Sequence, residues 1–143
     1  MVRVLICDDQ VISRQLFEMI VNGSEHYVLV KSLESAKVAD IYCSGGNVDL
    51  ILMDIQMPKI DGVTLARRLK DINPRINIIF CTGYAEYALD ACKMHVLGYL
   101  LKPIKQEELH EELEYAKNWA ISDVLLSVRC YGGFEAYDSN GQM

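Results

Sequence analysis

Five polar side chains suited to binding a cation and a phosphoryl group stand where four short apolar runs end. They are Asp8, Asp9, Asp54, Thr82 and Lys102. Clustered carboxylates repel one another by about 4 kcal/mol per pair at 4 Å and an effective dielectric of 20. A divalent cation removes this conflict, and Mg²⁺ suits hard oxygen ligands and retained waters. A carboxylate beside such a cation can attack a phosphoryl donor, while an ammonium and a hydroxyl stabilise the phosphoryl oxygens.

These side chains converge only if the apolar runs are parallel strands. Runs of strand length alternate with longer segments of helical period, which is typical of βα units. The predicted strands are Val2–Cys7, Tyr27–Lys31, Val48–Met53, Asn77–Cys81 and Gly98–Leu101. The predicted helices are Val11–Val21, Ala36–Cys43, Gly62–Ile72, Ala85–His95 and Lys105–Ala120. We therefore predict an α/β fold: a doubly wound, five-stranded parallel sheet flanked by five helices, with its ligands at the carboxyl ends of the strands.

Two predicted helices have faces that can be read from the sequence. In the first, the apolar stripe is formed by Ile12, Leu16, Met19 and Ile20. In the last, we interpret the acid run Glu107, Glu108, Glu111, Glu112 and Glu114 as a solvated face. Among single residues, we interpret Asp61 as a solvated turn residue and Tyr87 as ordinary packing.

Four motifs occur in order over residues 1–120, and together they resemble the receiver domain of bacterial two-component response regulators. They are Asp8-Asp9, the stretch Leu52–Gly62 around Asp54, Thr82-Gly83 and Tyr99–Pro103. Each motif alone is weak, whereas the ordered set is very specific. The resemblance implies a flavodoxin-like fold and a phosphorylation-controlled module, with self-catalysed phosphoryl transfer but no other enzymatic activity. It also implies a histidine kinase as partner.

The resemblance assigns a role to each motif residue. It implies that Asp54 accepts the phosphoryl group and binds Mg²⁺ together with Asp9, with Asp8 close by and acting partly through water. The backbone carbonyl of Gln56 is implied as a further ligand of the same ion. The resemblance thus implies two roles for Asp54, metal ligand and phosphoacceptor.

The resemblance also implies how phosphorylation is sensed. Thr82 and Tyr99 are the implied switch pair, in which the hydroxyl moves to the phosphate and the aromatic ring turns inward. Lys102 is expected to pair with the phosphoryl group, and its peptide bond to Pro103 is expected to be cis. A cis X-Pro bond costs only about 0.5–1 kcal/mol over trans, so a tight turn can hold it.

Two other classes of function remain as alternatives. A pseudo-receiver would keep the fold as an interaction scaffold, but the acids, Thr82 and Lys102 are all present. A metal-dependent phosphohydrolase is disfavoured, because the second acid two positions after the nucleophile is replaced by Gln56. The net charge of −6 opposes nucleic-acid binding by the chain itself. No apolar run reaches the length of a membrane span, so we expect no membrane contact and a cytoplasmic location.

Residues 121–143 differ in pattern from the rest of the chain. Val124–Tyr131 is predicted as a strand, and Phe134–Tyr137 follows as a second one after a Gly-Gly turn. Ser127–Tyr137 resembles the opening strands of a winged-helix transcriptional activator domain. Tyr84–Ala91 and Gly98–Pro103 are instead similar to receivers coupled to a LytTR-type DNA-binding domain. We therefore expect residues 1–120 to form the receiver domain and residues 121–143 to be a linker and the truncated start of an output domain. DNA contact is expected only through the missing part of that output domain, and a possible homodimer through the face spanning Ala85–Ala120.

Overall fold

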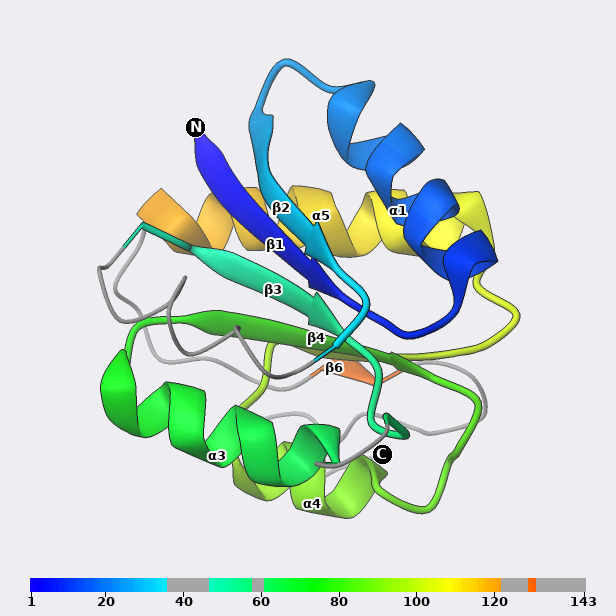
Figure 1. The fold of residues 1–143 in the computed structure, drawn as a ribbon. Helices are drawn as coiled ribbons and strands as arrows, with labels where there is room; N and C mark the ends of the chain where they lie inside the picture. The colour runs from blue at the N-terminus through cyan, green and yellow to red at the C-terminus, as the bar shows by residue number, and fades with distance from the viewer. Residues whose placement is uncertain (36–46, 58–60, 122–128, 131–143) are drawn as a thin grey trace.

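The sheet is parallel throughout and runs through the centre of the molecule (Figure 1). The computed structural model describes residues 1–35, 47–57, 61–121 and 129–130 of the 143. The strands are β1 (Val2–Cys7), β2 (Tyr27–Leu33), β3 (Leu50–Met53), β4 (Asn77–Thr82), β5 (Gly98–Leu101) and β6 (Arg129–Cys130). Their order across the sheet is β2-β1-β3-β4-β5-β6.

Helices cover both faces of the sheet. They are α1 (Val11–Asn22), α3 (Gly62–Ile72), α4 (Ala88–Lys93) and α5 (Gln106–Ile121). Helices α1 and α5 lie on one face, and α3 and α4 lie on the other (Figure 1). Each face has its own apolar core, because α1 and α5 bury side chains in one cluster and α3 and α4 in the other. No helix in the described part of the chain combines the length and hydropathy needed to span a bilayer.

The predicted fold class is confirmed, and most predicted elements lie within two residues of the observed ones. Three elements agree at both ends, namely β1, β5 and α3. The largest difference is in α4, which begins at Ala88 rather than Ala85. The predicted helix Ala36–Cys43 lies outside the described residues.

A sixth strand extends the predicted five-stranded sheet. Arg129 and Cys130 pair in parallel with Gly98 and Tyr99 of β5. These two residues fall inside the predicted strand Val124–Tyr131, while the second predicted strand, Phe134–Tyr137, lies outside the described residues. The chain after α5 therefore returns to the edge of the sheet beside Tyr99.

The predicted apolar stripe of α1 is wrong in two of its four members. Ile12 is 82% exposed and Met19 is 56% exposed, whereas Phe17, Ile20 and Val21 are buried. Apolar residues lie on more than one face of this helix, so period alone does not fix its orientation. The observed orientation buries Phe17, the largest apolar side chain of the helix, and burial free energy grows with apolar area.

The predicted solvated acid face of α5 is wrong at Glu112. This side chain is fully buried. Its carboxylate lies against Gly98, where an added Cβ would sit 2.6 Å from Glu112 Oε1. The absence of a side chain at Gly98 thus leaves room for an acid that the charge pattern alone assigns to solvent.

Candidate cation and phosphoryl site

The site is built from the carboxyl ends of four strands. Asp8 follows β1, Asp54 follows β3, Thr82 ends β4 and Lys102 follows β5. These strands are neighbours in the sheet, and backbone bonds hold the segments that leave them in register. The amide of Asp54 donates to the carbonyl of Cys7 at 3.1 Å, and that of Lys102 donates to the carbonyl of Thr82 at 2.8 Å.

Three carboxylates converge as the sequence predicts. A carboxylate oxygen from each of Asp8, Asp9 and Asp54 lies within 4.8 Å of the others. Asp8 and Asp54 are buried, while Asp9 is exposed to solvent. Carboxylate oxygens are hard ligands, so this set fits a small divalent cation that enters from solvent beside Asp9.

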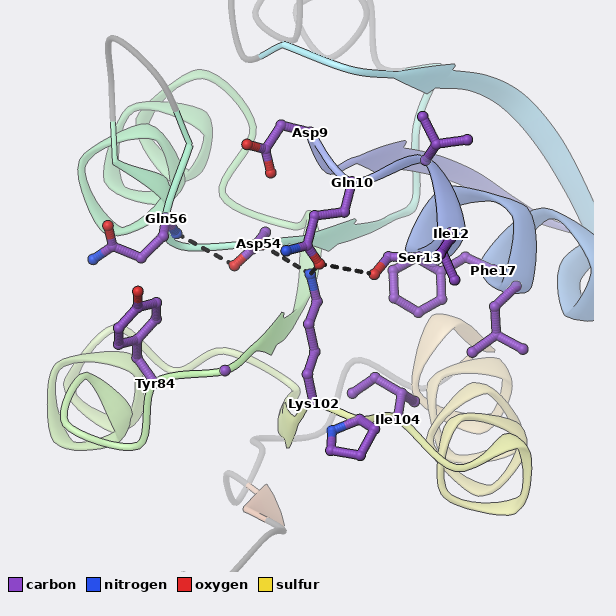
Figure 2. Close-up of a pocket in the computed structure, with 14 residues that line it drawn as sticks. Asp9, Gln10, Ile12, Ser13, Phe17, Asp54, Gln56, Tyr84, Lys102 and Ile104 are labelled. Carbon is purple, nitrogen blue, oxygen red and sulfur yellow. Dashed lines mark hydrogen bonds and ion pairs between the residues drawn. The ribbon is translucent and has the colours of Figure 1, made fainter.

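Lys102 is the central cation of the site (Figure 2). Its ammonium donates to Asp8 Oδ2 and to Asp54 Oδ2, both at 2.9 Å. A third bond runs to Gln10 Oε1 at 2.8 Å. The peptide bond between Lys102 and Pro103 is cis. Three carboxylates against one ammonium leave two formal negative charges.

Burial and pairing shift the pKa values of this ion cluster in ways that follow from its geometry. Burial raises the pKa of Asp8, although its hydrogen bonds from the Gln10 amide and Lys102 oppose the rise. Burial lowers the pKa of Lys102, but the hydrogen bonds and charges of Asp8 and Asp54 outweigh that effect, so the pKa is raised. The ion pairs with Asp8 and Asp54 thus favour the charged form of Lys102.

The implied switch pair lies on the two strands beside Asp54. Thr82 is buried, and its hydroxyl accepts a long hydrogen bond of 3.3 Å from the Tyr84 amide. Tyr99 is also fully buried, with its ring edge-on to Phe80 and its hydroxyl donating to the Tyr84 carbonyl. The ring thus already occupies the inward position, and Tyr84 contacts both members of the pair.

Gln56 contributes a side-chain contact that the sequence did not indicate. Its backbone amide donates to Asp54 Oδ1 at 3.3 Å. Its side-chain amide donates to the hydroxyl of Tyr87 at 3.0 Å. Tyr87, interpreted from the sequence as ordinary packing, therefore ties the segment after Asp54 to the start of α4.

Helix α3 begins directly beside Asp54 for two local reasons. Asp61, expected to be only a solvated turn residue, caps the helix by accepting from the Thr64 amide at 2.8 Å. The spacing of an acid three residues before Thr64 is a signal that could have revealed this cap. Gly62 follows, and an added Cβ there would lie 2.3 Å from the Asp54 carbonyl oxygen.

A groove leads away from the ion cluster along α1 (Figure 2). One end is lined by Asp9, Asp54 and Lys102. The other end is apolar and includes Ile12 and Ile104. A phosphoryl donor can thus reach Asp54 from solvent through this groove.

A parallel sheet with an acid cluster and a lysine at its carboxyl edge is the arrangement of a receiver domain. A family model of the response regulator receiver domain matches residues 4–114, and the chain belongs to this family.

Relatives support the same assignment. The positive alginate biosynthesis regulatory protein of Pseudomonas aeruginosa is 36% identical over 114 residues, covering 79% of this chain and 46% of that protein. The transcriptional regulatory protein NatR of Bacillus subtilis is 35% identical over 109 residues, covering 76% of this chain and 47% of that protein. The chain thus spans about half the length of these curated relatives.

Solved structures agree with the fold. The receiver domain of AraT from Geobacillus stearothermophilus is 32% identical, with a TM-score of 0.70, and covers 81% of this chain and 92% of that chain. The response regulatory domain of mrkE from Klebsiella pneumoniae is 24% identical, with a TM-score of 0.78, and covers 83% of this chain and 98% of that chain.

Proposed function

We propose that Asp54 accepts a phosphoryl group from the phosphohistidine of a histidine kinase, with Mg²⁺ bound by Asp9, Asp54 and the Gln56 carbonyl. One observation carries the proposal: the Lys102 ammonium bonds Asp8 and Asp54 in a three-carboxylate cluster at the mouth of a groove. Membership of the receiver family makes a histidine kinase the natural donor.

The transfer is a single displacement at phosphorus. An oxygen of the Asp54 carboxylate forms the new O–P bond, and the N–P bond of the phosphohistidine breaks. The electron pair of that bond stays on the imidazole, which takes a proton from solvent. The chain is thus a phosphoacceptor that catalyses its own modification, and we propose no other enzymatic activity.

Different groups around Asp54 stabilise different charges during the transfer. Mg²⁺, when bound, neutralises charge on the carboxylates and on the phosphoryl oxygens. Lys102 stabilises the oxygens on its own side with a charge-assisted hydrogen bond. Asp8 holds the ammonium of Lys102 in place through its bond of 2.9 Å.

Phosphorylation is then sensed by Thr82 and Tyr99. Within the described part of the chain, the Thr82 hydroxyl gives up one long hydrogen bond, of 3.3 Å from the Tyr84 amide, when it moves to a phosphoryl oxygen. When the Tyr84 backbone moves, its carbonyl moves too, and the Tyr99 hydroxyl donates to that carbonyl. The state of Asp54 is thereby read out at the surface formed by α4, β5 and α5.

We further propose that this chain is the receiver part of a longer, cytoplasmic transcription regulator. Relatives such as NatR and BtsR carry that function in their names, and this chain covers less than half of each. DNA contact would come from a further domain beginning within residues 121–143. A winged helix and a LytTR domain are the two candidate types. The similarity to the sensory transduction protein LytT of Bacillus subtilis, 29% identical over 117 residues, favours the second.

Mass spectrometry after incubation with acetyl phosphate tests the chemistry. The wild type should gain one phosphoryl mass in the presence of Mg²⁺ and lose that gain when the metal is chelated. Asp54→Asn should not be labelled, whereas the exposed Asp61→Asn, on the same segment, should be labelled like the wild type. Labelling of the Asp54→Asn protein at the wild-type level would overturn the assignment.

A further inference from the structure

We propose that Gln10 is a positioning residue for phosphoryl transfer: its side-chain oxygen holds the third hydrogen of the Lys102 ammonium and yields it to a phosphoryl oxygen. This proposal rests on the proposed phosphoacceptor function of Asp54. It adds a residue that neither the strand-end pattern nor the four sequence motifs assign to the site.

The backbone of Gln10 is fixed on both sides. Its amide donates to Asp8 Oδ1 at 2.8 Å, and its carbonyl accepts from the Arg14 amide at 3.1 Å. Gln10 is the N-cap residue of α1, yet its side chain makes no capping hydrogen bond. Helix capping therefore does not account for where this side chain points.

The side chain turns instead toward the ion cluster. Gln10 Oε1 accepts from Lys102 Nζ at 2.8 Å and from Ser13 Oγ at 3.3 Å. Figure 2 shows the amide group of Gln10 beside the ammonium, over the opening that also holds Asp54. Because an ammonium only donates, the atom that faces it must be the amide oxygen, so Nε2 points elsewhere.

The three acceptors of Lys102 differ in how readily they can be replaced. An ammonium has three hydrogens, and Asp8, Asp54 and Gln10 take all three. The two carboxylates are charged and buried, whereas Gln10 is neutral and exposed. Asp8 and Asp54 attract the ammonium as ion-pair partners at 2.9 Å, whereas Gln10 offers it only a neutral dipole. A negatively charged phosphoryl oxygen therefore displaces Gln10 first.

Among the residues whose placement is given, none accepts a hydrogen bond from Gln10 Nε2. The amide therefore carries a donor that is ready for an incoming anion once its oxygen releases Lys102. Holding the ammonium before transfer and giving it up during transfer are two parts of one role. Loss of the side-chain amide should slow transfer without changing the fold.

The test substitutes Gln10 by Met, which keeps length and volume but removes the amide. Gln15→Met is the matched control, because Gln15 is exposed on the same helix and does not line the groove. Two readouts are measured on the full chain: hydrogen exchange of the Lys102 ammonium by NMR, and the rate of labelling by acetyl phosphate at saturating Mg²⁺. We expect faster ammonium exchange and about three- to tenfold slower labelling in Gln10→Met, as for loss of one partly exposed hydrogen bond.

A charge variant separates the two parts of the role. Gln10→Glu keeps an acceptor for Lys102 but makes it a carboxylate that a phosphoryl oxygen cannot easily displace. Its ammonium should exchange as slowly as that of the wild type, while its labelling should be slowed at least as much as in Gln10→Met.

The outcomes decide between a positioning role and mere proximity. Unchanged ammonium exchange or unchanged labelling in Gln10→Met would overturn the proposal, as would wild-type labelling of Gln10→Glu. Effects of equal size in Gln15→Met would overturn it too, because they would belong to the helix. If the wild type itself takes up no phosphoryl group, the proposed function fails and this proposal fails with it. A labelled wild type beside an equally labelled Gln10→Met removes this proposal alone.

Discussion

At the scale of single residues, Gly62 is important because the backbone around it leaves no room for a side chain. An added Cβ would lie 2.3 Å from the Asp54 carbonyl oxygen and 2.7 Å from Ile55 Cα. Both of those atoms are backbone, which cannot swing aside as a flexible side chain can. The Gly62 amide also donates to the Ile55 carbonyl at 2.6 Å, so the two segments are held together.

Gly62→Ala should therefore displace the backbone that carries Asp54. We expect a loss of about 1–3 kcal/mol in the free energy of unfolding, the usual cost of overpacking, together with slower labelling of Asp54. Urea denaturation and acetyl phosphate labelling measure the two effects. Gly83→Ala is the control for stability, because an added Cβ there meets nothing within 4 Å. Equal stability losses in the two variants would contradict the steric explanation.

Thr82 should affect the response to phosphorylation more than phosphorylation itself. The Thr82 hydroxyl makes one long bond to Tyr84, and Tyr84 in turn accepts from Tyr99. Thr82→Ala should therefore be labelled nearly as fast as the wild type, but with smaller amide NMR shift changes around Tyr99. Thr82→Ser keeps the hydroxyl and should respond like the wild type. Identical shift changes in wild type and Thr82→Ala would refute the switch role.

The residues that the sequence identified are those whose place follows from topology. Asp8, Asp54 and Lys102 come directly after strands, and parallel strands bring their carboxyl ends to one edge. Gln10 and Tyr87 lie further along the connections, where contacts depend on side-chain rotamers that a sequence pattern does not encode. Their hydrogen bonds to Lys102 and Gln56 were therefore found only in three dimensions.

At the scale of elements, one ion pair joins the starts of two strands that carry the site. Arg3 donates to both carboxylate oxygens of Asp49, at 3.0 and 2.9 Å, and its backbone amide also donates to Asp49 at 2.8 Å. The hydrogen bond and charge of Arg3 lower the pKa of Asp49. The pair is partly solvated, because its side chains are 43% and 30% exposed.

This pair should contribute stability that depends on pH. A folded-state pKa below the unfolded value means that the contribution is fully present above the unfolded pKa, about 4 for Asp. It is lost as the pH falls through the lowered folded-state pKa. Asp49→Asn should cost about 0.2–1 kcal/mol in unfolding free energy at pH 7, the usual range for an exposed pair. Urea denaturation of both proteins at pH 7 and pH 3 measures the change, which should be smaller at pH 3.

A difference that stays the same at pH 7 and pH 3 would show that Asp49 acts through packing or its backbone contact instead. Asp71→Asn provides the control, because Asp71 is an exposed acid at the end of α3. Its substitution should change stability little at either pH.

Element boundaries were predictable where local signals were strong. Asn73-Pro74 ends α3, and the apolar runs of β1 and β5 define those strands fully. Which face a helix buries was less predictable, as Phe17 and Glu112 show. That choice depends on the shape of the surface below the helix, here on the space at Gly98.

At the scale of the whole molecule, the surface of α4, β5 and α5 is where a change at Tyr99 would be felt. Tyr99 lies on β5, and β6 runs along the same strand at Gly98 and Tyr99. Because β6 already pairs with the edge of β5, a second copy would contact the helices beside β5 more than the backbone edge of β5. Leu89 of α4 is 66% exposed and offers an apolar contact there.

Phosphorylation should promote pairing of two copies through this surface, and Leu89→Asp should prevent it. The substitution places a charge in an apolar contact, which is costly to bury without a partner. Light scattering of the acetyl phosphate-treated protein should give a higher mass for the wild type than for Leu89→Asp, with equal labelling of Asp54 in both. Met19→Asp is the matched control, because Met19 is 56% exposed on α1, which covers the face of the sheet opposite to α4 and Leu89. A wild-type mass that is the same with and without phosphodonor would count against pairing, and loss of pairing in Met19→Asp would move the contact to the α1 side.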